Sequence, residues 1–165
     1  MSTASTPPSL QLLRPEHAPA LLAFEEANRA YFAASVPDRG DAYFARFAAR
    51  HAALLAEQAA GGCYFHVLVG DEGEVLGRVN LVDVADGRAE LGYRIAEKAA
   101  GQGLATRAVR QACDLAVTAY GLSELRAVTT LDNPASRAVL TRTGFVPTGD
   151  IRVDGRPGTG YVLTL

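Results

Sequence analysis

Apolar residues recur at two different spacings along this chain, and each spacing predicts a different kind of element. Over 15–29 and again over 41–58 they recur every three or four residues, which is typical of amphipathic helices. Asp41 is expected to cap the second of these helices. From Cys63 onward, short β-branched runs between glycine-rich turns predict three strands, at 63–69, 74–84 and 89–95. Because the turns between them are short, the three strands should form an antiparallel meander.

The carboxy-terminal half continues with alternating helices and strands. An apolar stripe predicts a helix over 104–120, and a β-branched run at 125–131 predicts the next strand. Since a helix separates this strand from the last strand of the meander, the two should pair in parallel. A helix opening at Pro134 and a final hairpin over 145–165 complete the chain. With a first strand at 10–13, the order β-α-α-β-β-β-α-β-α-β-β predicts a mixed α/β (α+β) domain, with one sheet and helices on both of its faces.

Composition restricts the class of protein further. The chain has 165 residues, about the size of a single domain, which we place at 10–165 behind a disordered amino-terminal tail at 1–9. Its formal net charge of -2 provides no basic field for nucleic acid or an anionic membrane surface. Two cysteines in apolar contexts, no signal-like start and no apolar run of about 18 residues are typical of a reduced, cytoplasmic protein. No metal is expected.

A glycine-bearing loop between the third meander strand and the next helix is the strongest local signal. Gly101 and Gly103 flank Gln102, so the chain can turn tightly and present backbone N–H groups to a ligand. The unpaired N–H groups and the positive dipole end of the following helix favour a phosphate or pyrophosphate. The loop is neither a Walker motif, which needs Gly-Lys-Ser/Thr, nor a dinucleotide fingerprint, since Thr106 replaces the third glycine. The residues alone therefore predict an anion site.

Two segments of the chain carry a family resemblance. Leu91–Ile95 (LGYRI) is followed by Gly101–Ala105 (GQGLA), and Asn133–Ser136 (NPAS) leads to Thr143–Phe145 (TGF). The first pair is similar to the strand and pyrophosphate loop of the GNAT superfamily of acetyl-CoA-dependent N-acetyltransferases. The second pair is similar to a signature of its RimJ/RimL-type subgroup, which includes acetyltransferases of ribosomal-protein N-termini. The loop departs from the family pattern at Ala100, where glutamine or arginine is usual, although the backbone donors remain.

The resemblance implies a GNAT-like acyl-CoA N-acyltransferase fold, in which the parallel central strands splay apart, with acetyl-CoA as cosubstrate. Backbone groups of Tyr93 and Ile95 would bind the pantetheine arm and polarise the thioester carbonyl as oxyanion donors. Backbone N–H groups across the loop would bind the pyrophosphate, and Asn133 with Ser136 would lie near the thioester. The implied cofactor-binding residues are therefore Tyr93, Arg94, Ile95, Gly101, Gln102, Gly103, Leu104, Ala105, Thr106, Asn133 and Ser136.

Two catalytic residues used by many relatives are missing. A tyrosine that protonates the leaving thiolate corresponds here to Leu140, and a glutamate that acts as base in some relatives corresponds to Val128. A thiolate with a pKa of about 8.5 can leave without a strong acid, so these changes do not exclude activity. Glu90, on the central strand just before the cofactor-binding residues, is the candidate general base. The alternative is a solvent-facing or ion-paired strand glutamate.

The amine acceptor has no clear signature in the sequence. The implied reaction acetylates a primary amine, on a protein N-terminus or a small molecule, directly within a ternary complex. Glu25 and Glu26 on the first helix either line the acceptor groove and attract an amine, or form a solvated helix face. With Asp41, they leave open an acetyltransferase acting on a polycationic antibiotic or polyamine. The changes at Val128 and Leu140 leave open a non-catalytic acyl-CoA-binding sensor. A homodimer fits the family, and neither nucleic acid nor membrane is expected as a partner.

The three histidines are expected to be structural. His66 lies within an apolar strand, which indicates core packing rather than catalysis, whereas His17 and His51 are predicted on helix surfaces.

Overall fold

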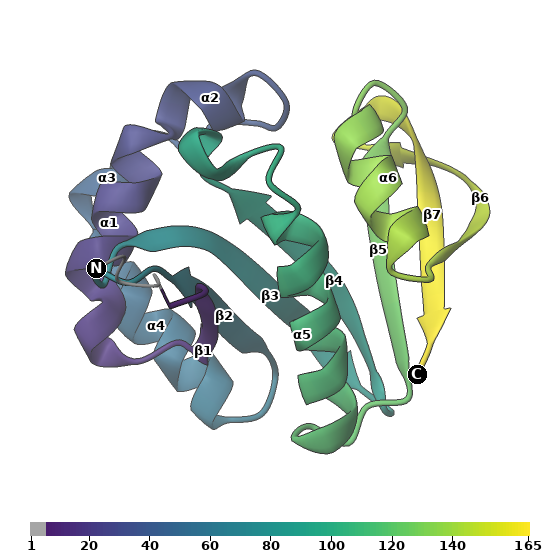
Figure 1. The fold of residues 1–165 in the computed structure, drawn as a ribbon, viewed down its shortest axis with the longest axis horizontal. Coiled ribbons are helices and arrows are strands. Elements are labelled where there is room, and N and C mark those ends of the chain that lie inside the picture. The colour runs from purple at the N-terminus through teal and green to yellow at the C-terminus, as the bar shows by residue number, and fades with distance from the viewer. Residues whose placement is uncertain (1–5) are drawn as a thin grey trace, which may run out of the picture.

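A seven-stranded sheet forms the centre of the molecule (Figure 1). The computed structural model describes residues 6–165. The strands follow the order β1-β2-β3-β4-β5-β7-β6 across the sheet, and among the described residues only β4 and β5 pair in parallel. The predicted mixed sheet, its meander and its parallel pair are therefore confirmed. The strands are β1 (Ser9–Leu12), β2 (Tyr64–Val69), β3 (Val75–Ala85), β4 (Arg88–Ile95), β5 (Glu124–Thr130), β6 (Val146–Val153) and β7 (Arg156–Thr164).

The predicted tail at 1–9 is only partly covered by the structure. Residues 1–5 lie outside the described part of the chain, and Ser9 already belongs to β1, one residue earlier than the predicted domain boundary.

Helices cover both faces of the sheet, as predicted. α1 packs against β3 and α4 against β2, while α5 contacts β1, β3 and β4, and α6 contacts β5. In β3, Arg78 points toward α1, where it meets Glu25, so its neighbour Val79 points to the opposite face. No helix within 6–165 combines the length and apolar character needed to cross a bilayer. The helices are η1 (Pro15–His17), α1 (Ala18–Ala27), α2 (Arg29–Ala33), α3 (Asp41–Ala45), α4 (Phe47–Ala59), η2 (Glu97–Ala99), α5 (Leu104–Thr118) and α6 (Pro134–Arg142).

The amino-terminal helices are shorter than predicted, because both predicted helices are interrupted, the first after α1 and the second after α3. Asn28, after α1, leaves the helical conformation while its side chain bonds to backbone in two directions. Its amide donates to the Phe24 carbonyl at 2.8 Å, and its carbonyl accepts the Glu97 N–H at 2.9 Å. Asp41 is the first residue of α3 rather than its cap, since Gly40 precedes the helix with a φ of 88°. The capping prediction was wrong.

The two parallel strands separate partway along their length. β4 and β5 are in register only from Arg88 opposite Glu124 to Glu90 opposite Arg126. Beyond that point β4 continues to Ile95 alongside β3, while β5 continues alongside β7. Beyond that point, the backbone N–H and C=O groups of β4 and β5 that face each other form no hydrogen bonds with one another. The candidate site described below lies at this opening.

His66 is a packed core histidine, as predicted. It is 1% exposed, and its Nδ1 donates to the Val79 carbonyl at 3.0 Å. Since a carbonyl can only accept, Nε2 is left to accept from the Tyr120 hydroxyl, 2.6 Å away. Burial lowers the pKa of His66 and so favours this neutral form.

His17 and His51 are buried, which corrects the prediction that they lie on helix surfaces. Both serve the backbone of Arg14, where the chain turns from β1 into the helices. The Arg14 N–H donates to His17 Nδ1 at 2.9 Å, and His51 Nε2 donates to the Arg14 carbonyl at 3.1 Å. His17 thus pairs the Arg14 N–H, and His51 adds a second donor to the Arg14 carbonyl, which also accepts the His17 N–H at 3.1 Å.

Candidate functional site

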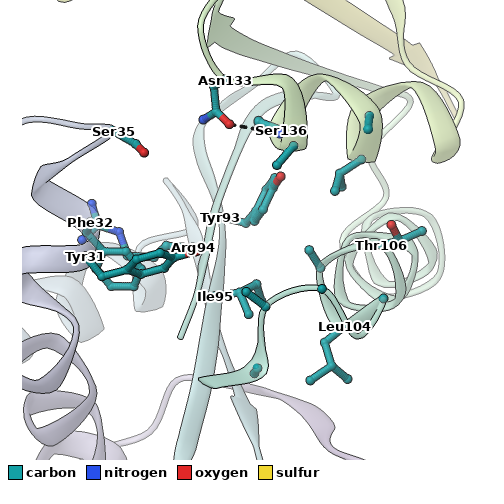
Figure 2. A pocket seen from close by; sticks show the side chains of 18 of the residues that line it. Tyr31, Phe32, Ser35, Tyr93, Arg94, Ile95, Leu104, Thr106, Asn133 and Ser136 are labelled. Carbon is teal, nitrogen blue, oxygen red and sulfur yellow. Dashed lines mark hydrogen bonds between the residues drawn. The ribbon is translucent and has the colours of Figure 1, made fainter. Parts of the chain in front are cut away.

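A cavity of about 500 Å³, the first cavity, lies between β4, the start of α5, α6 and the segment after α2 (Figure 2). It contains ten of the predicted site residues, which come from three separate elements. Glu90 and Gln102 are not among its lining residues. The predicted residues that line it are Tyr93, Arg94, Ile95, Gly101, Gly103, Leu104, Ala105, Thr106, Asn133 and Ser136.

The glycine loop brings the start of α5 to the wall of this cavity. Gly101 and Gly103 both have a φ of 75°, a left-handed conformation that other residues adopt only with strain. Gly103 stands at the cap position, where no side chain bonds the helix end. The first intrahelical bond runs from the Arg107 N–H to the Gly103 carbonyl, so the N–H groups of 104–106 remain free of helical partners. These donors and the helix dipole favour an anion.

Gln102 supports the loop from outside the cavity. Its side-chain amide donates to the Lys98 carbonyl at 3.3 Å, so the side chain folds back over η2. Any contact of Gln102 with a cofactor would therefore come from its backbone.

Asn133 and Ser136 are positioned by the start of α6. Asn133 Oδ1 accepts the Ser136 N–H at 3.2 Å and caps the helix, while Pro134 takes its first position (Figure 2). Tyr93 directs its phenol toward Ser136 across the first cavity (Figure 2). Burial raises the pKa of Tyr93, and the Ser136 hydroxyl offsets part of that rise. The side chain of Tyr93 thus joins the site, whereas the sequence had assigned only its backbone.

A second cavity of about 410 Å³ adjoins the first where β4 and β5 separate. The two cavities share Ser35, Val36, Tyr93, Asn133 and Ser136. Residues from β5 and the β6–β7 hairpin complete the second cavity, and apart from Val128 the sequence did not single out their side chains. Its remaining lining residues are Ala33, Pro37, Leu91, Gly92, Val128, Thr129, Thr130, Val153, Asp154 and Arg156.

Gly92 keeps this second cavity open on the β4 side. A Cβ atom at this position would meet no described atom within 4 Å, and the backbone is not in the left-handed region. Neither backbone conformation nor a described neighbour therefore excludes a larger residue here, but its side chain would occupy the cavity. A glycine inside a strand pattern is the sequence signal for a site of this kind.

Glu90 lies at the last paired position before the strands separate, opposite Val82 and Arg126. It shares a strand face with Gly92, two residues further on, but lines neither cavity. Val128, where some relatives carry a base, lines the second cavity and is 42% exposed. Leu140 is 1% exposed in the core and has no polar group to offer.

Glu25 is neither a groove residue nor part of a solvated helix face, and both predictions for it were wrong. It is 1% exposed, and its carboxylate meets Arg39 Nε at 3.0 Å, Arg78 Nη1 at 3.0 Å and Arg94 Nη1 at 3.2 Å. Burial favours the neutral acid and would raise its pKa, but the three guanidinium charges outweigh it, so the pKa of Glu25 lies below its usual range. Glu26 beside it is exposed.

The Glu25 cluster also holds one wall of the first cavity. Arg94 extends from β4 between Glu25 and the ring of Phe32, with its guanidinium carbon 4.5 Å from the ring centre (Figure 2). Arg29 secures the adjoining connection between α2 and α3 by pairing with Asp38 and Asp41, each at 2.8 Å. Asp41 thus forms a surface ion pair, with its side chain 97% exposed.

The charges on the two cavity walls favour anions over cations. The described lining residues of the two cavities include Arg94, Arg142 and Arg156, but a single carboxylate, Asp154. A polycationic ligand needs several uncompensated carboxylates, and these walls do not supply them.

Comparison with known proteins agrees with this geometry. The family model for the acetyltransferase (GNAT) domain matches residues 9–146. Uncharacterized N-acetyltransferase p20 of Bacillus licheniformis is 31% identical over 90 residues, a match that spans 53% of this chain and 51% of that protein's length. The chain thus matches about half of this curated relative.

Two solved structures share the fold over nearly the whole chain. Ribosomal-protein-S5-alanine acetyltransferase from Vibrio fischeri matches with a TM-score of 0.90 at 21% identity, covering 98% of this chain and 97% of that one. Mycobacterium smegmatis RimJ in complex with CoA-disulfide matches with a TM-score of 0.84 at 25% identity, covering 97% and 86%. The predicted RimJ/RimL-type resemblance is therefore confirmed.

Proposed function

The chain belongs to the GNAT acetyltransferase family, and we propose that it transfers the acetyl group of acetyl-CoA directly to a primary amine within a ternary complex. The observation that carries this proposal is the pair of adjoining cavities, which share the wall formed by Tyr93 and Ser136. One cavity would hold the thioester donor and the other the amine, so that the two reactants meet where β4 and β5 separate.

The first cavity fits coenzyme A chemically. The free N–H groups at the start of α5 suit a pyrophosphate, and no carboxylate lines the cavity among the described residues. Arg142 adds a positive charge to its wall. On the side that faces β5, the backbone of Tyr93–Ile95 has no strand partner. Its amide groups could therefore hydrogen-bond a pantetheine arm, as the edge strand of a sheet binds a peptide. When bound, acetyl-CoA supplies the activated acetyl group.

We propose that the chain assists transfer mainly by orientation and by backbone donors. The amine nitrogen forms a bond to the acetyl carbon, the carbon–sulfur bond breaks, and the amine proton leaves to a base or water while the thiolate takes a proton. A backbone N–H of Tyr93 or Ile95 would stabilise the developing oxyanion. Leu140 cannot act as the acid, so the thiolate leaves on its own low basicity.

Glu90 remains the proposed base, acting through water, since it lies two residues from the cavity wall at Gly92. If so, Glu90→Gln should lower kcat/KM by about 100-fold. Acetyl-CoA affinity should stay unchanged. Glu124→Gln on the neighbouring strand is the control, because Glu124 lies opposite Arg88, at the end of the parallel pairing away from the opening. A loss below about threefold in Glu90→Gln would remove this residue from the mechanism.

For the acceptor we propose a protein N-terminus or a small amine. The polyamine or polycationic-antibiotic alternative depended on Glu25, Glu26 and Asp41. Glu25 is buried against three arginines, and neither Glu26 nor Asp41 lines either cavity. The sensor alternative, based on Val128 and Leu140, predicts binding without turnover.

A cytoplasmic location, a homodimer and the division into a tail at 1–9 and one domain at 10–165 stay predictions.

Calorimetry with acetyl-CoA and a thiol-release assay with peptides and small amines test the proposal together. We expect saturable binding and release of one thiol per acetylated amine. Tight binding with no release on any acceptor would support the sensor instead. Absence of acetyl-CoA binding would contradict both.

Gly92→Val should separate the acceptor from the cofactor. A β-branched residue suits a strand, so the fold should be kept, but its side chain would fill the open space of the second cavity. We expect kcat/KM for the amine to fall at least about tenfold, with CoA affinity within about threefold of the unchanged protein. Steady-state kinetics and calorimetry measure the two effects. Unchanged kinetics would mean that the amine does not approach along Gly92.

A further inference from the structure

Arg156 joins three segments around the second cavity. It is the first residue of β7, directly after the turn of the terminal hairpin. Its Nη2 pairs with Asp132 on the connection between β5 and α6. Its Nη1 donates to the backbone carbonyl of Ser35, on the connection after α2, at 3.5 Å. Arg156 therefore lies on the wall of the second cavity, where the terminal hairpin meets the segment after α2.

The two contacts of Arg156 differ in strength. The Asp132 carboxylate is a charged partner that orients the planar guanidinium. The Ser35 contact is at the outer limit of a hydrogen bond, so it can be exchanged at little cost. A guanidinium has about five N–H donors, and these contacts use only part of them. With its side chain 46% exposed, Arg156 is an oriented cation with donors to spare.

The rest of the second cavity provides no other cation. Among the described residues that line it, Arg156 is the one positively charged side chain, and its neighbours there include Val36, Pro37, Val128 and Val153. An oxygen of the acceptor in this cavity would therefore find its strongest donor at Arg156. The guanidinium of Arg156 already donates to an oxygen of this kind, the backbone carbonyl of Ser35.

We propose that Arg156 is a specificity-determining residue that binds a carbonyl or carboxylate oxygen next to the reacting amine, in place of the Ser35 carbonyl. The preferred acceptor is then an α-amino acyl compound such as a peptide N-terminus, whose first carbonyl lies one carbon away from the amine. A plain alkylamine lacks this oxygen. Asp132 is the positioning residue that orients Arg156. This inference rests on the proposed acetyl transfer.

The test compares alaninamide with sec-butylamine, which has a similar branched shape but no carbonyl. Arg156→Met should lower kcat/KM for alaninamide by about 10- to 100-fold, mainly through KM, because a hydrogen bond from a charged donor is lost. It should change kcat/KM for sec-butylamine less than about twofold. Each variant is compared with the unchanged protein on the same amine, so the different amine pKa values cancel. Arg156→Lys should restore part of the loss, and Asp132→Asn should show a smaller loss of the same kind.

Each other outcome overturns a defined part of the argument. Equal losses on both amines, or none on alaninamide, would overturn the role of Arg156 while acetyl transfer stands. No turnover of any amine by the unchanged protein would overturn acetyl transfer itself, and this inference with it. Calorimetry with CoA is the folding control, since Arg156 lines only the second cavity and its variants should bind CoA normally.

Discussion

Replacing Gly103 with valine should abolish acetyl-CoA binding, with the dissociation constant rising roughly 100-fold or more, equivalent to about 2.8 kcal/mol. Gly103 has a φ of 75°, which a β-branched residue adopts only with strain. The loop would have to relax, and the N–H groups of 104–106 would turn away from the pyrophosphate. The valine side chain would also enter open space at the cavity wall, since a Cβ there has no described neighbour within 4 Å. Calorimetry with acetyl-CoA measures the effect.

Gly121→Val is the matched control. Gly121 lies beyond the far end of α5, a 15-residue helix about 22 Å long, and has a φ of 66° with similarly open surroundings. It should suffer a comparable backbone strain and loss of stability without losing acetyl-CoA affinity. If Gly103→Val binds acetyl-CoA as the unchanged protein does, the loop does not hold the pyrophosphate.

Glu25→Gln should destabilise the protein by about 3–5 kcal/mol, the usual cost of removing one partner from a buried ion pair. Three guanidinium groups share this carboxylate, and the Arg78 side chain is itself only 4% exposed. Without Glu25, buried positive charges would repel one another with no compensating anion. Urea denaturation measures the loss. Glu26→Gln, the exposed neighbour on α1, should change stability by less than about 0.5 kcal/mol.

Acidification probes the same cluster without a substitution. The folded state depresses the pKa of Glu25, so its contribution is complete above the unfolded value of about 4.3 and is lost as the pH falls through the folded value. Below about pH 4.5 the free energy of unfolding of the unchanged protein should therefore fall more steeply than that of Glu25→Gln. If the free energies of unfolding of the two proteins fell equally steeply in acid, Glu25 would not be the titrating group. If Glu25→Gln lost little stability at neutral pH, water would already compensate the positive charges of the three arginines.

The Glu25 cluster matters for function because it holds the site wall. Arg94 lines the first cavity, and Arg39 tethers the connection between α2 and α3, whose residues Ser35 and Val36 line both cavities. A carboxylate that looked available to attract a substrate amine is in fact the internal anchor of this wall.

The sequence by itself determined the strands, the two carboxy-terminal helices and the glycine loop at the start of α5. These features depend on short-range rules. Side-chain alternation marks a strand within a few residues, and a left-handed backbone, as at Gly103, favours glycine whatever surrounds it. The same locality explains why the motifs from Leu91 to Phe145 were enough to indicate the family. It also explains the error in the first helices, where Asn28 breaks the pattern partly through a bond to Glu97, far along the chain.

Only the tertiary structure decided what the charged side chains do. Glu25 meets partners 14, 53 and 69 residues away, and Arg156 reaches Ser35 across 121 residues. Whether a carboxylate attracts a substrate or anchors a wall depends on which charges surround it and how far it is removed from water. Those quantities are set by packing between distant segments, which the spacing of residues along the chain does not specify.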